Sequence, residues 1–238
     1  MASEDARRAN RLLAALPEAD TARMNGQLRQ RSVERRESLH EPGQPIYEVH
    51  FPLDAVVSIL IRMDEGNSVE IATIGHEGLV GLTVAWGGAG GEMNRREVAT
   101  VQVPGEIVSM DADVFRAEVD RKGQFASLVQ RYTLAFFSHV SQQVACNGLH
   151  SVEQRCARWL LLTHDRVGAD EFPMTHEFLA QMLGVRRATV TVTAGILQRA
   201  GLVEFSRGRA KVVDRAGLGG AACECYAATR QVFDRILP

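Results

Sequence analysis

The sequence has no long hydrophobic run and no apolar leader. None of its uninterrupted apolar stretches approaches the roughly 20 residues that a membrane-spanning helix needs. The N-terminal stretch MASEDARRANRLLAALPEAD lacks the apolar core of a secretory signal. We therefore expect a cytoplasmic protein with no membrane partner.

Cysteine is scarce and confined to the second half of the chain. There is none before Cys146, and the others are Cys156, Cys223 and Cys225. Without an export signal, these thiols are expected to stay reduced. Cys223 and Cys225 form a lone C-x-C pair, short of the four ligands of a zinc site or an iron–sulfur cluster. We expect packed or exposed thiols and no metal site, with a redox role for the pair as the alternative.

Length and composition fit one large domain or two modest ones. The 238 residues are 45% hydrophobic and 24% charged, which is enough for a packed core in a globular protein. The net charge of −2 is unevenly divided, at +3 for 151–238 and −5 for 1–150. Only Glu204 opposes the basic residues of 186–211, which are Arg186, Arg187, Arg199, Arg207, Arg209 and Lys211. This patch is typical of a nucleic-acid contact, with a solvated charged face as the alternative.

The region from about 33 to 110 is rich in β-forming residues. Runs such as IYEVHF, AVVSILIRM and SVEIATIG are separated by the turn clusters EPGQPI and MDEGNS. A glycine-rich segment at 87–92 is followed by EVATVQVPGEIVSM, which predicts two more strands. Many short strands between turn signals predict an antiparallel sandwich or barrel. The thirty residues before this region have the apolar spacing of helices around Pro17.

Beyond residue 110 the pattern becomes helical. Asp111 is expected to cap a short helix, and 124–148 to form a long one. Because the long helix has apolar side chains on more than one face, it must bury more than one face. We expect it to pack on its own β domain and on a second copy in a symmetric homodimer, with a central core helix as the alternative.

Residues 151–238 combine helices with two short strands. Ser151 is expected to cap a helix that ends before Gly168, DEFPMT to be a loop, and Thr175 to cap HEFLAQMLG. Two short strands are predicted around Arg207-Gly208. The final segment is predicted to be a helix with one apolar stripe, made of Ala222, Tyr226, Phe233 and Ile236.

The segment 186–199 is ambiguous between strand and helix. VTVT (190–193) alternates as a half-buried strand does. A helix is favoured because Gly184 suits a left-handed helix end, and because Val190, Ala194 and Leu197 recur at helical spacing. A helix, a glycine-containing turn, a second helix and a hairpin form the pattern of a winged helix-turn-helix.

In that arrangement the second helix turns a row of side chains outward, with Gln198 near the same face. Arg187 can bond a guanine, and Ala188 or Val192 can meet a thymine methyl group. Arg186 and Thr189 suit phosphate oxygens. The predicted DNA-binding residues are Arg186, Arg187, Ala188, Thr189, Thr191, Val192, Arg207 and Arg209.

These motifs resemble the Crp/Fnr superfamily of bacterial transcription regulators. MTHEFLAQMLGVRRATVTVTAGILQRAGLVEFSRGRAKVVD is similar to the DNA-binding domain of that family, and LHSVEQRCARWLL to the helix after its dimer helix. EPGQPI and FPLDAVVSIL resemble parts of its cyclic-nucleotide-binding-like double-stranded β-helix. The resemblance implies an α+β fold with a jelly-roll-like sensor domain (1–120), a dimerisation helix and hinge (121–150) and a winged helix-turn-helix domain (151–238).

The resemblance also implies a function. The protein would bind a palindromic operator in double-stranded DNA as a homodimer through the helix at 186–199, under control of an effector or partner at the β domain. RNA polymerase is a further implied partner, and a regulator without a small-molecule effector is the alternative. By position, Arg187, Ala188 and Val192 occupy base-reading places. Cyclic-AMP-type members have Glu and Arg in place of Ala188 and Val192, so their operator sequence is not transferred.

The effector is harder to predict. In nucleotide-binding members, a Gly-Glu pair and an Arg-Ser/Thr-Ala run hold the cyclic phosphate. The matching segments IGHEGLVGL and NRREVATV make Glu77, Arg95 and Arg96 the candidate effector residues. Glu97 is a poor neighbour for a phosphate, so cyclic AMP is disfavoured, and another nucleotide or no ligand is expected. The resemblance predicts no N-terminal iron–sulfur cluster, and His76 alone is expected to be polar surface rather than a haem ligand.

Signatures of catalysis are missing as well. Double-stranded β-helices also occur in cupin metal enzymes, whose ligands converge on one metal. His40, His50 and His76 are too dispersed for that pattern, and there is no H-x-H, P-loop or Ser/His/Asp order. We expect a protein that is not an enzyme, with a cupin-like metal-dependent enzyme as the alternative.

Overall fold

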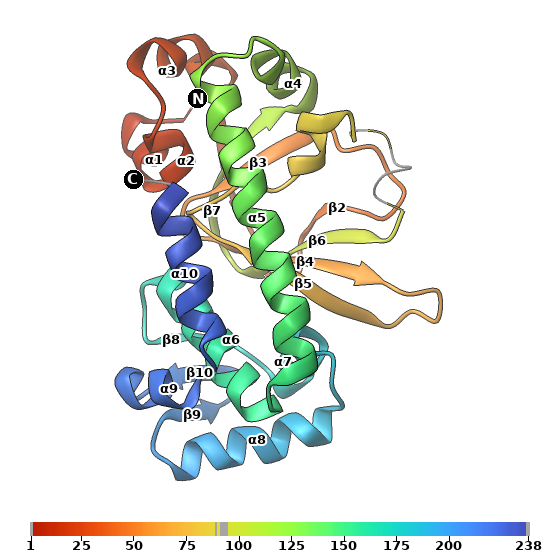
Figure 1. Cartoon of the computed structure of the whole chain (residues 1–238), viewed down its shortest axis with the longest axis vertical. Coiled ribbons are helices and arrows are strands. Elements are labelled where there is room, and N and C mark those ends of the chain that lie inside the picture. Colours follow the sequence, from red (N-terminus) through yellow and green to blue (C-terminus); the bar gives the residue numbers. More distant parts are fainter. Residues whose placement is uncertain (1, 89, 91–94, 237–238) are drawn as a thin grey trace.

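The computed structural model describes residues 2–88, 90 and 95–236. Parts of the glycine-rich segment 87–92, and the first residue of NRREVATV, lie outside the described residues. The chain runs from a group of short helices into a β-rich domain, along one long helix, and into a C-terminal domain of helices and short strands (Figure 1). This order matches the α+β architecture predicted from the sequence.

Short helices open the chain, as the apolar spacing around Pro17 predicts. They are α1 (Glu4–Ala9), α2 (Arg11–Ala14), α3 (Glu18–Met24) and the 3₁₀ turn η1 (Asn25–Gln27). Asn10 fixes them to the β domain. Its side-chain oxygen accepts hydrogen bonds from the backbone of Leu12 and Leu13, while its amide donates to the carbonyls of Pro52 and Gly78 at 2.9 Å each.

Two antiparallel sheets form the β domain, as expected for a jelly-roll-like sandwich. The first sheet has the order β1-β7-β3 and the second β2-β6-β4-β5. The segments of β1 and β2 were not predicted as strands, because β1 (sequence RQRSV) is polar and exposed except at Val33 and so lacks the apolar alternation of a core strand. The strands are β1 (Arg29–Val33), β2 (Ser38–His40), β3 (Glu48–Pro52), β4 (Val56–Arg62), β5 (Ser68–Ile74), β6 (Glu97–Val103) and β7 (Gly105–Asp111), with a 3₁₀ turn η2 (Leu82–Trp86).

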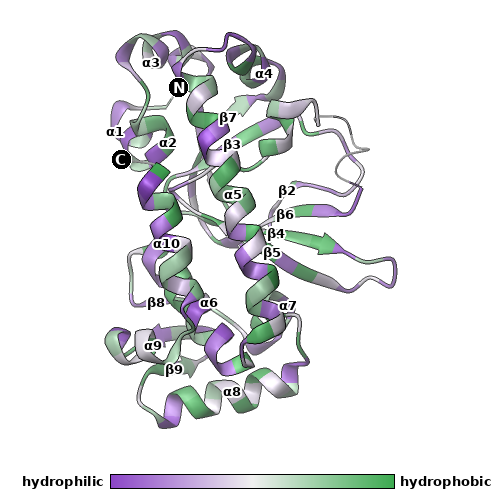
Figure 2. Ribbon diagram, viewed as in Figure 1, coloured by the Kyte–Doolittle hydropathy of each residue, from purple (hydrophilic) through white to green (hydrophobic). Residues whose placement is uncertain are grey.

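Two helices follow the sandwich. Asp111 caps α4 (Ala112–Asp120) by accepting hydrogen bonds from the backbone of Asp113 and Val114, as predicted. The long helix α5 (Gln124–Leu149) buries Phe125, Leu128, Val129 and Tyr132 in the core of the β domain. Its other side, which faces the viewer in Figure 1 and carries apolar stretches in Figure 2, is left uncovered by the described residues of one copy.

The C-terminal domain follows the predicted order with two corrections. Ser151 begins α6 with a capping box, Gly168 ends it at φ 65°, and Thr175 caps α7. DEFPMT is not simply a loop, because Glu171–Pro173 pairs with the wing hairpin as a third strand. The elements are α6 (Val152–Val167), β8 (Glu171–Pro173), α7 (His176–Leu183), α8 (Arg187–Arg199), β9 (Val203–Ser206), β10 (Arg209–Val212), α9 (Arg215–Ala221) and α10 (Cys225–Ile236).

The second correction concerns the last segment, which forms two helices rather than one. Ala222 adopts an extended backbone conformation and separates α9 from α10. The buried stripe of α10 consists of Cys225, Thr229 and Phe233, so the predicted stripe through Ala222 was wrong. Phe233 packs against α5, with its ring 6.2 Å from the ring of Tyr132 and 5.9 Å from that of His139.

Buried polar contacts join α6 to the second sheet of the β domain. The Trp159 indole donates to Glu70 at 2.8 Å, and the Gln102 amide donates to the Thr163 hydroxyl at 3.1 Å. Leu60 and Val98 of the sheet share an apolar cluster with Trp159. The two domains are therefore packed together by specific contacts along α6.

Glu70 makes this junction sensitive to pH. Burial raises the pKa of Glu70 from 4.5 to about 7, and its second oxygen has no hydrogen-bond partner among the described residues. The Glu70 carboxyl group thus binds its proton more tightly in the folded protein than in the unfolded chain. The stability it contributes is complete below pH 4.5 and is lost as the pH rises through about 7.

We expect Glu70→Gln to stabilise the protein at pH 8 and to have little effect at pH 4.5. The gain is at most about 3.5 kcal/mol, since the shift is about 2.5 pKa units and each unit corresponds to about 1.4 kcal/mol. Urea unfolding at the two pH values measures it, with Glu65→Gln in the exposed β4–β5 turn as the control. An equal effect of Glu70→Gln at both pH values would contradict the raised pKa.

Candidate nucleic-acid interface

A sharp turn holds α7 and α8 at a fixed angle. Gly184 ends α7 at φ 64°, a left-handed conformation that glycine adopts at low steric cost. Behind the turn, Leu179, Met182, Val190 and Leu197 are buried in one apolar cluster with α6 and the wing strands. The helix α8 is thereby fixed with one face inward and the other in solvent.

The exposed face of α8 carries five of the eight residues predicted to contact DNA, and the other three lie just before α8 and in the wing. Val192 is 63% exposed, whereas Val190 and Thr193 are buried. VTVT is therefore helical, with two side chains turned inward and two outward, and the alternating strand pattern is misleading. All of the predicted DNA-binding residues are exposed, namely Arg186, Arg187, Ala188, Thr189, Thr191, Val192, Arg207 and Arg209.

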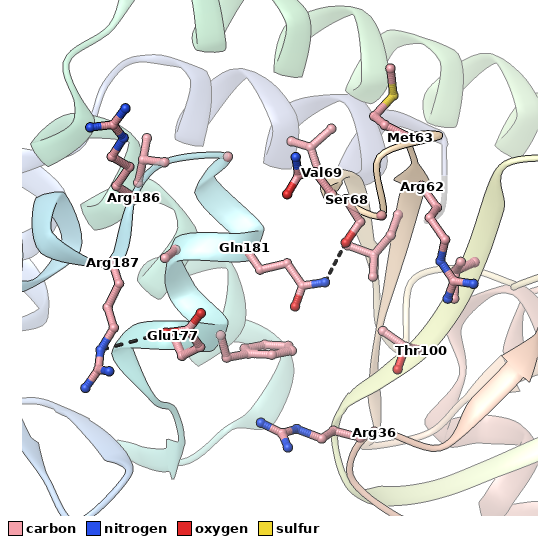
Figure 3. A pocket seen from close by; sticks show the side chains of 18 of the residues that line it. Arg36, Arg62, Met63, Ser68, Val69, Thr100, Glu177, Gln181, Arg186 and Arg187 are labelled. Carbon is pink, nitrogen blue, oxygen red and sulfur yellow. Dashed lines mark hydrogen bonds and ion pairs between the residues drawn. The ribbon is translucent and has the colours of Figure 1, made fainter.

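Weak contacts occupy the polar groups of this face. The Arg187 guanidinium lies 3.8 Å from the Glu177 carboxylate, and both side chains are exposed (Figure 3). Exposed pairs of this kind contribute about 0–1 kcal/mol, so Arg187 can exchange Glu177 for another acceptor at little cost. The Thr191 hydroxyl donates to the Arg187 carbonyl and lies 3.2 Å from the His176 ring nitrogen.

The wing lies beside α8. Arg207 (φ 47°) and Gly208 (φ 77°) form its tight turn, and the Arg209 side chain pairs with Glu171 of β8. Gln198 is exposed, as predicted for a residue near the outer face, and its side-chain oxygen also accepts a hydrogen bond from the Phe205 backbone at 2.6 Å. Its role is therefore to hold the wing against α8, which no local sequence signal indicates.

A cleft of about 1420 Å³ separates α7 and the start of α8 from the β domain (Figure 3). The Gln181 amide bridges its edge by donating to the Ser68 hydroxyl at 2.6 Å. Basic side chains predominate among its charged groups, with Arg36, Arg62, Arg186 and Arg187 facing Glu41 and Glu177.

The three candidate effector residues do not share contacts. Glu77 is buried, and Arg166 of α6 donates to it at 2.7 and 2.9 Å. Burial alone would raise the pKa of Glu77, but the charge and hydrogen bonds of Arg166 outweigh it and lower the pKa to about 2. Arg96 pairs with Asp64 at 2.8 Å in an exposed turn, and Arg95 is exposed beside it. Their binding of an effector stays a prediction.

One group of side chains revises the sequence interpretation of the cysteines. The donor atoms of Cys146, His150, Cys223 and Cys225 all lie within 4.8 Å of one another. C-x-C alone has too few ligands, but the end of α5 supplies the other two. This Cys₃His group can hold a metal ion, contrary to the expectation of no metal site.

Comparison with known proteins agrees with this geometry. A family model for the Crp-like helix-turn-helix domain matches residues 154–220. A solved structure from Eubacterium rectale, described as a transcriptional regulator of the Crp/Fnr family, has a TM-score of 0.70 and 19% identity over 90% of this chain and 98% of that chain. The sequence has no significant match among curated proteins.

Two further solved structures share the fold. FixK2 from Bradyrhizobium japonicum has a TM-score of 0.67 and 16% identity, over 82% of this chain and 98% of that one. The c-di-GMP-responsive global regulator CLP of Xanthomonas campestris has a TM-score of 0.60 and 15% identity, over 83% of this chain and 100% of that one.

Residues 154–220 thus form a Crp-like helix-turn-helix domain, which follows the β sandwich and the long helix in the chain. The whole chain shares its fold with the solved Crp/Fnr-family structure from Eubacterium rectale and with FixK2. Among the described residues, no helix is both long enough and apolar enough to span a membrane.

Proposed function

We propose that the protein binds a palindromic operator as a homodimer, with α8 of each copy in a major groove. The observation that carries the proposal is the solvent-exposed face of α8, which holds Arg187, Ala188, Thr191 and Val192 clear of the protein core. Arg187 is the charged base reader of this face, and the two apolar side chains suit thymine methyl groups. A two-fold axis places the two α8 helices about 34 Å apart, one turn of DNA.

The uncovered side of α5 supports the homodimer. Leu134, Phe137 and Val144 are 64%, 71% and 69% exposed. Their spacing of three and seven residues is that of a coiled-coil seam, with Ser141 at the intervening position. A seam of this kind on a monomer would leave large apolar side chains in water, whereas two copies of α5 bury it.

Arginines of the interface separate into two predicted roles. We expect Arg187→Ala to weaken operator binding by about 1–3 kcal/mol and to relax the preference at one base pair. Arg207→Ala is expected to weaken binding to all sequences alike and to flatten its salt dependence, because a phosphate contact carries no sequence information. Operators obtained by genomic-fragment selection, and scrambled versions of them, measured over a salt series, test both variants. Equal losses of Arg187→Ala on the two DNAs would refute its base-reading role.

We also propose that an effector or partner at the β domain modulates DNA binding. Support comes from the buried contacts that link the sheet to α6, since a change in the sheet can be transmitted to the DNA-binding domain through them. The relative from Xanthomonas campestris is described as responsive to c-di-GMP. Cyclic AMP stays disfavoured for this chain, because Glu97 follows the candidate residues Arg95 and Arg96.

A panel of cyclic mono- and dinucleotides tests this second part. An effector is expected to change operator affinity in the intact protein, and Arg95→Ala or Arg96→Ala to reduce that response without changing the affinity measured in its absence. If no nucleotide changes operator affinity, the regulator is constitutive or responds to a partner protein.

A further inference from the structure

Four metal-binding side chains meet where the long helix ends. Cys146 and His150 come from the last turn of α5 and the residue after it, while Cys223 and Cys225 come from the start of α10 and the residues before it. The three cysteines are buried and form a small core cluster of their own. Cys146 and Cys223 have their sulfur atoms 3.5 Å apart, and the Cys225 sulfur lies 3.5 Å from Nδ1 of His150.

These separations fit one tetrahedral metal ion. Zn–S bonds of about 2.3 Å and Zn–N bonds of about 2.0–2.1 Å in a tetrahedron place neighbouring donor atoms about 3.5–3.8 Å apart. All four donors here lie within 4.8 Å of one another. An iron–sulfur cluster would hold them farther apart, because its ligands bind different iron atoms. A disulfide would need the sulfur atoms about 2.05 Å apart.

The surroundings of the donors are those of a metal site. Nε2 of His150 lies 3.2 Å from the Glu224 carboxylate. A carboxylate on the outer nitrogen fixes the tautomer whose Nδ1 is free to bind a metal. The Gln142 amide donates to the Cys225 sulfur at 3.0 Å, an arrangement that suits a thiolate.

Buried positive charge lies next to the cysteines. Arg155 and Arg158 of α6 are buried, and their hydrogen bonds go to neutral acceptors, the Leu183 carbonyl and the Gln143 amide oxygen. No carboxylate pairs with either guanidinium among the described residues, although their charges interact with Cys146. Three thiolates and a neutral histidine around Zn²⁺ carry a net charge of −1, which compensates charge that is costly to bury alone.

We propose that Cys146, His150, Cys223 and Cys225 bind one Zn²⁺ ion as a closed structural site. Soft sulfur ligands in a tetrahedron select zinc among the common divalent ions, and four protein ligands leave no open position for catalysis. The thiol protons are released to solvent as the ion binds. The ion ties the end of α5 to the start of α10, and so fixes the joint at which the C-terminal domain begins.

Metal analysis of the full-length protein tests the site directly. The protein, purified in reducing buffer and incubated with ZnCl₂ before desalting, is expected to retain one zinc per chain and no acid-labile sulfide. Cys225→Ser is expected to retain none, whereas Cys156→Ser, which changes a buried cysteine outside the site, is expected to retain one. Replacing zinc with Co²⁺ is expected to give the intense visible and sulfur-to-metal absorption bands of a tetrahedral thiolate site.

A variant that keeps all four ligands distinguishes a weakened zinc site from loss of zinc through misfolding. Glu224→Gln is expected to fold and to lower zinc affinity by about 10–100-fold, the usual effect of removing a ligand-orienting carboxylate. Substoichiometric zinc in the wild-type protein, stoichiometric iron with sulfide, a Cys146–Cys223 disulfide in the reduced preparation, or equal zinc loss in Cys156→Ser would each overturn the proposal. The readout is metal content, so it is independent of whether the protein binds the proposed operator.

Discussion

Replacing Glu77 by alanine is expected to lower the free energy of unfolding by about 3–5 kcal/mol. Arg166 is buried, and Glu77 is its carboxylate partner at 2.7 Å, with Thr73 accepting a further hydrogen bond at 2.8 Å. Removing the carboxylate leaves an arginine charge inside the protein with a single hydroxyl and a carbonyl as acceptors. Urea unfolding at pH 7 measures the loss.

An exposed pair provides the control for this prediction. Glu4 and Arg8 also form an ion pair, but their side chains are 67% and 74% exposed, so Glu4→Ala is expected to cost less than about 0.5 kcal/mol. The double variant Glu77→Leu with Arg166→Met is expected to recover most of the loss, since neither charge stays buried alone. A cost below about 1 kcal/mol for Glu77→Ala would show that the pair does not hold the two domains together.

The same pair predicts the acid side of the stability curve. The pKa of Glu77 is about 2 in the folded protein and 4.5 as its ordinary value. Its contribution to stability is therefore present above pH 4.5 and is lost as the pH falls toward 2. The contribution of Glu70 to stability is instead lost as the pH rises, because its pKa is raised. The two buried carboxylates together therefore favour a maximum of stability at mildly acidic pH.

Replacing Phe137 by aspartate is expected to separate the proposed dimer. Burying a phenylalanine contributes about 1.5–3 kcal/mol, and the two-fold axis counts it twice, so the dissociation constant is expected to rise by about two to four orders of magnitude. Loss of the dimer should also remove tight binding to a two-half-site operator. Sedimentation equilibrium and binding to one and two half-sites measure the two effects.

Tyr47→Asp is the matched control for this variant. Tyr47 is also 71% exposed, but it lies in the loop before β3 and outside the seam on α5. It is expected to leave both the dimer and operator binding unchanged. If Phe137→Asp stays dimeric, the copies associate through another surface.

Local signals explain the parts of the fold that the sequence predicts well. Asp111, Ser151, Thr175 and Gly184 each act within a few residues, so helix ends could be placed without knowledge of the tertiary structure. Gly184 at the end of α7 also favours a helix for VTVT (190–193), because a helix that ends there is followed by a turn and a second helix. This signal outweighs the alternation of apolar and polar residues in VTVT, which by itself suggests a strand.

The errors arise where distant segments meet. Phe172 belongs to a three-residue strand, too short for any periodicity, and its partner Ala210 lies far along the chain. Cys146 and His150 are separated from the C-x-C pair by the whole helix-turn-helix, so counting ligands in one local motif missed half of the group that can hold a metal ion. Glu77 is likewise buried in an ion pair with Arg166 of α6. Its neighbours in IGHEGLVGL do not indicate this pairing, because Arg166 is far away in the sequence.

The path of α10 limits how the DNA-binding domain can move. The chain enters this domain once, at His150, and α10 then returns along α5 to the N-terminal helices, where Asp234 pairs with Arg11 at 3.1 Å (Figure 1). Together with the contacts of α6 on the second sheet, α10 thus holds the domain in addition to the single point where the chain enters it. Any rotation must either drag α10 along α5 or detach Phe233 from it, so the transition between two orientations is expected to be an abrupt switch rather than a gradual drift.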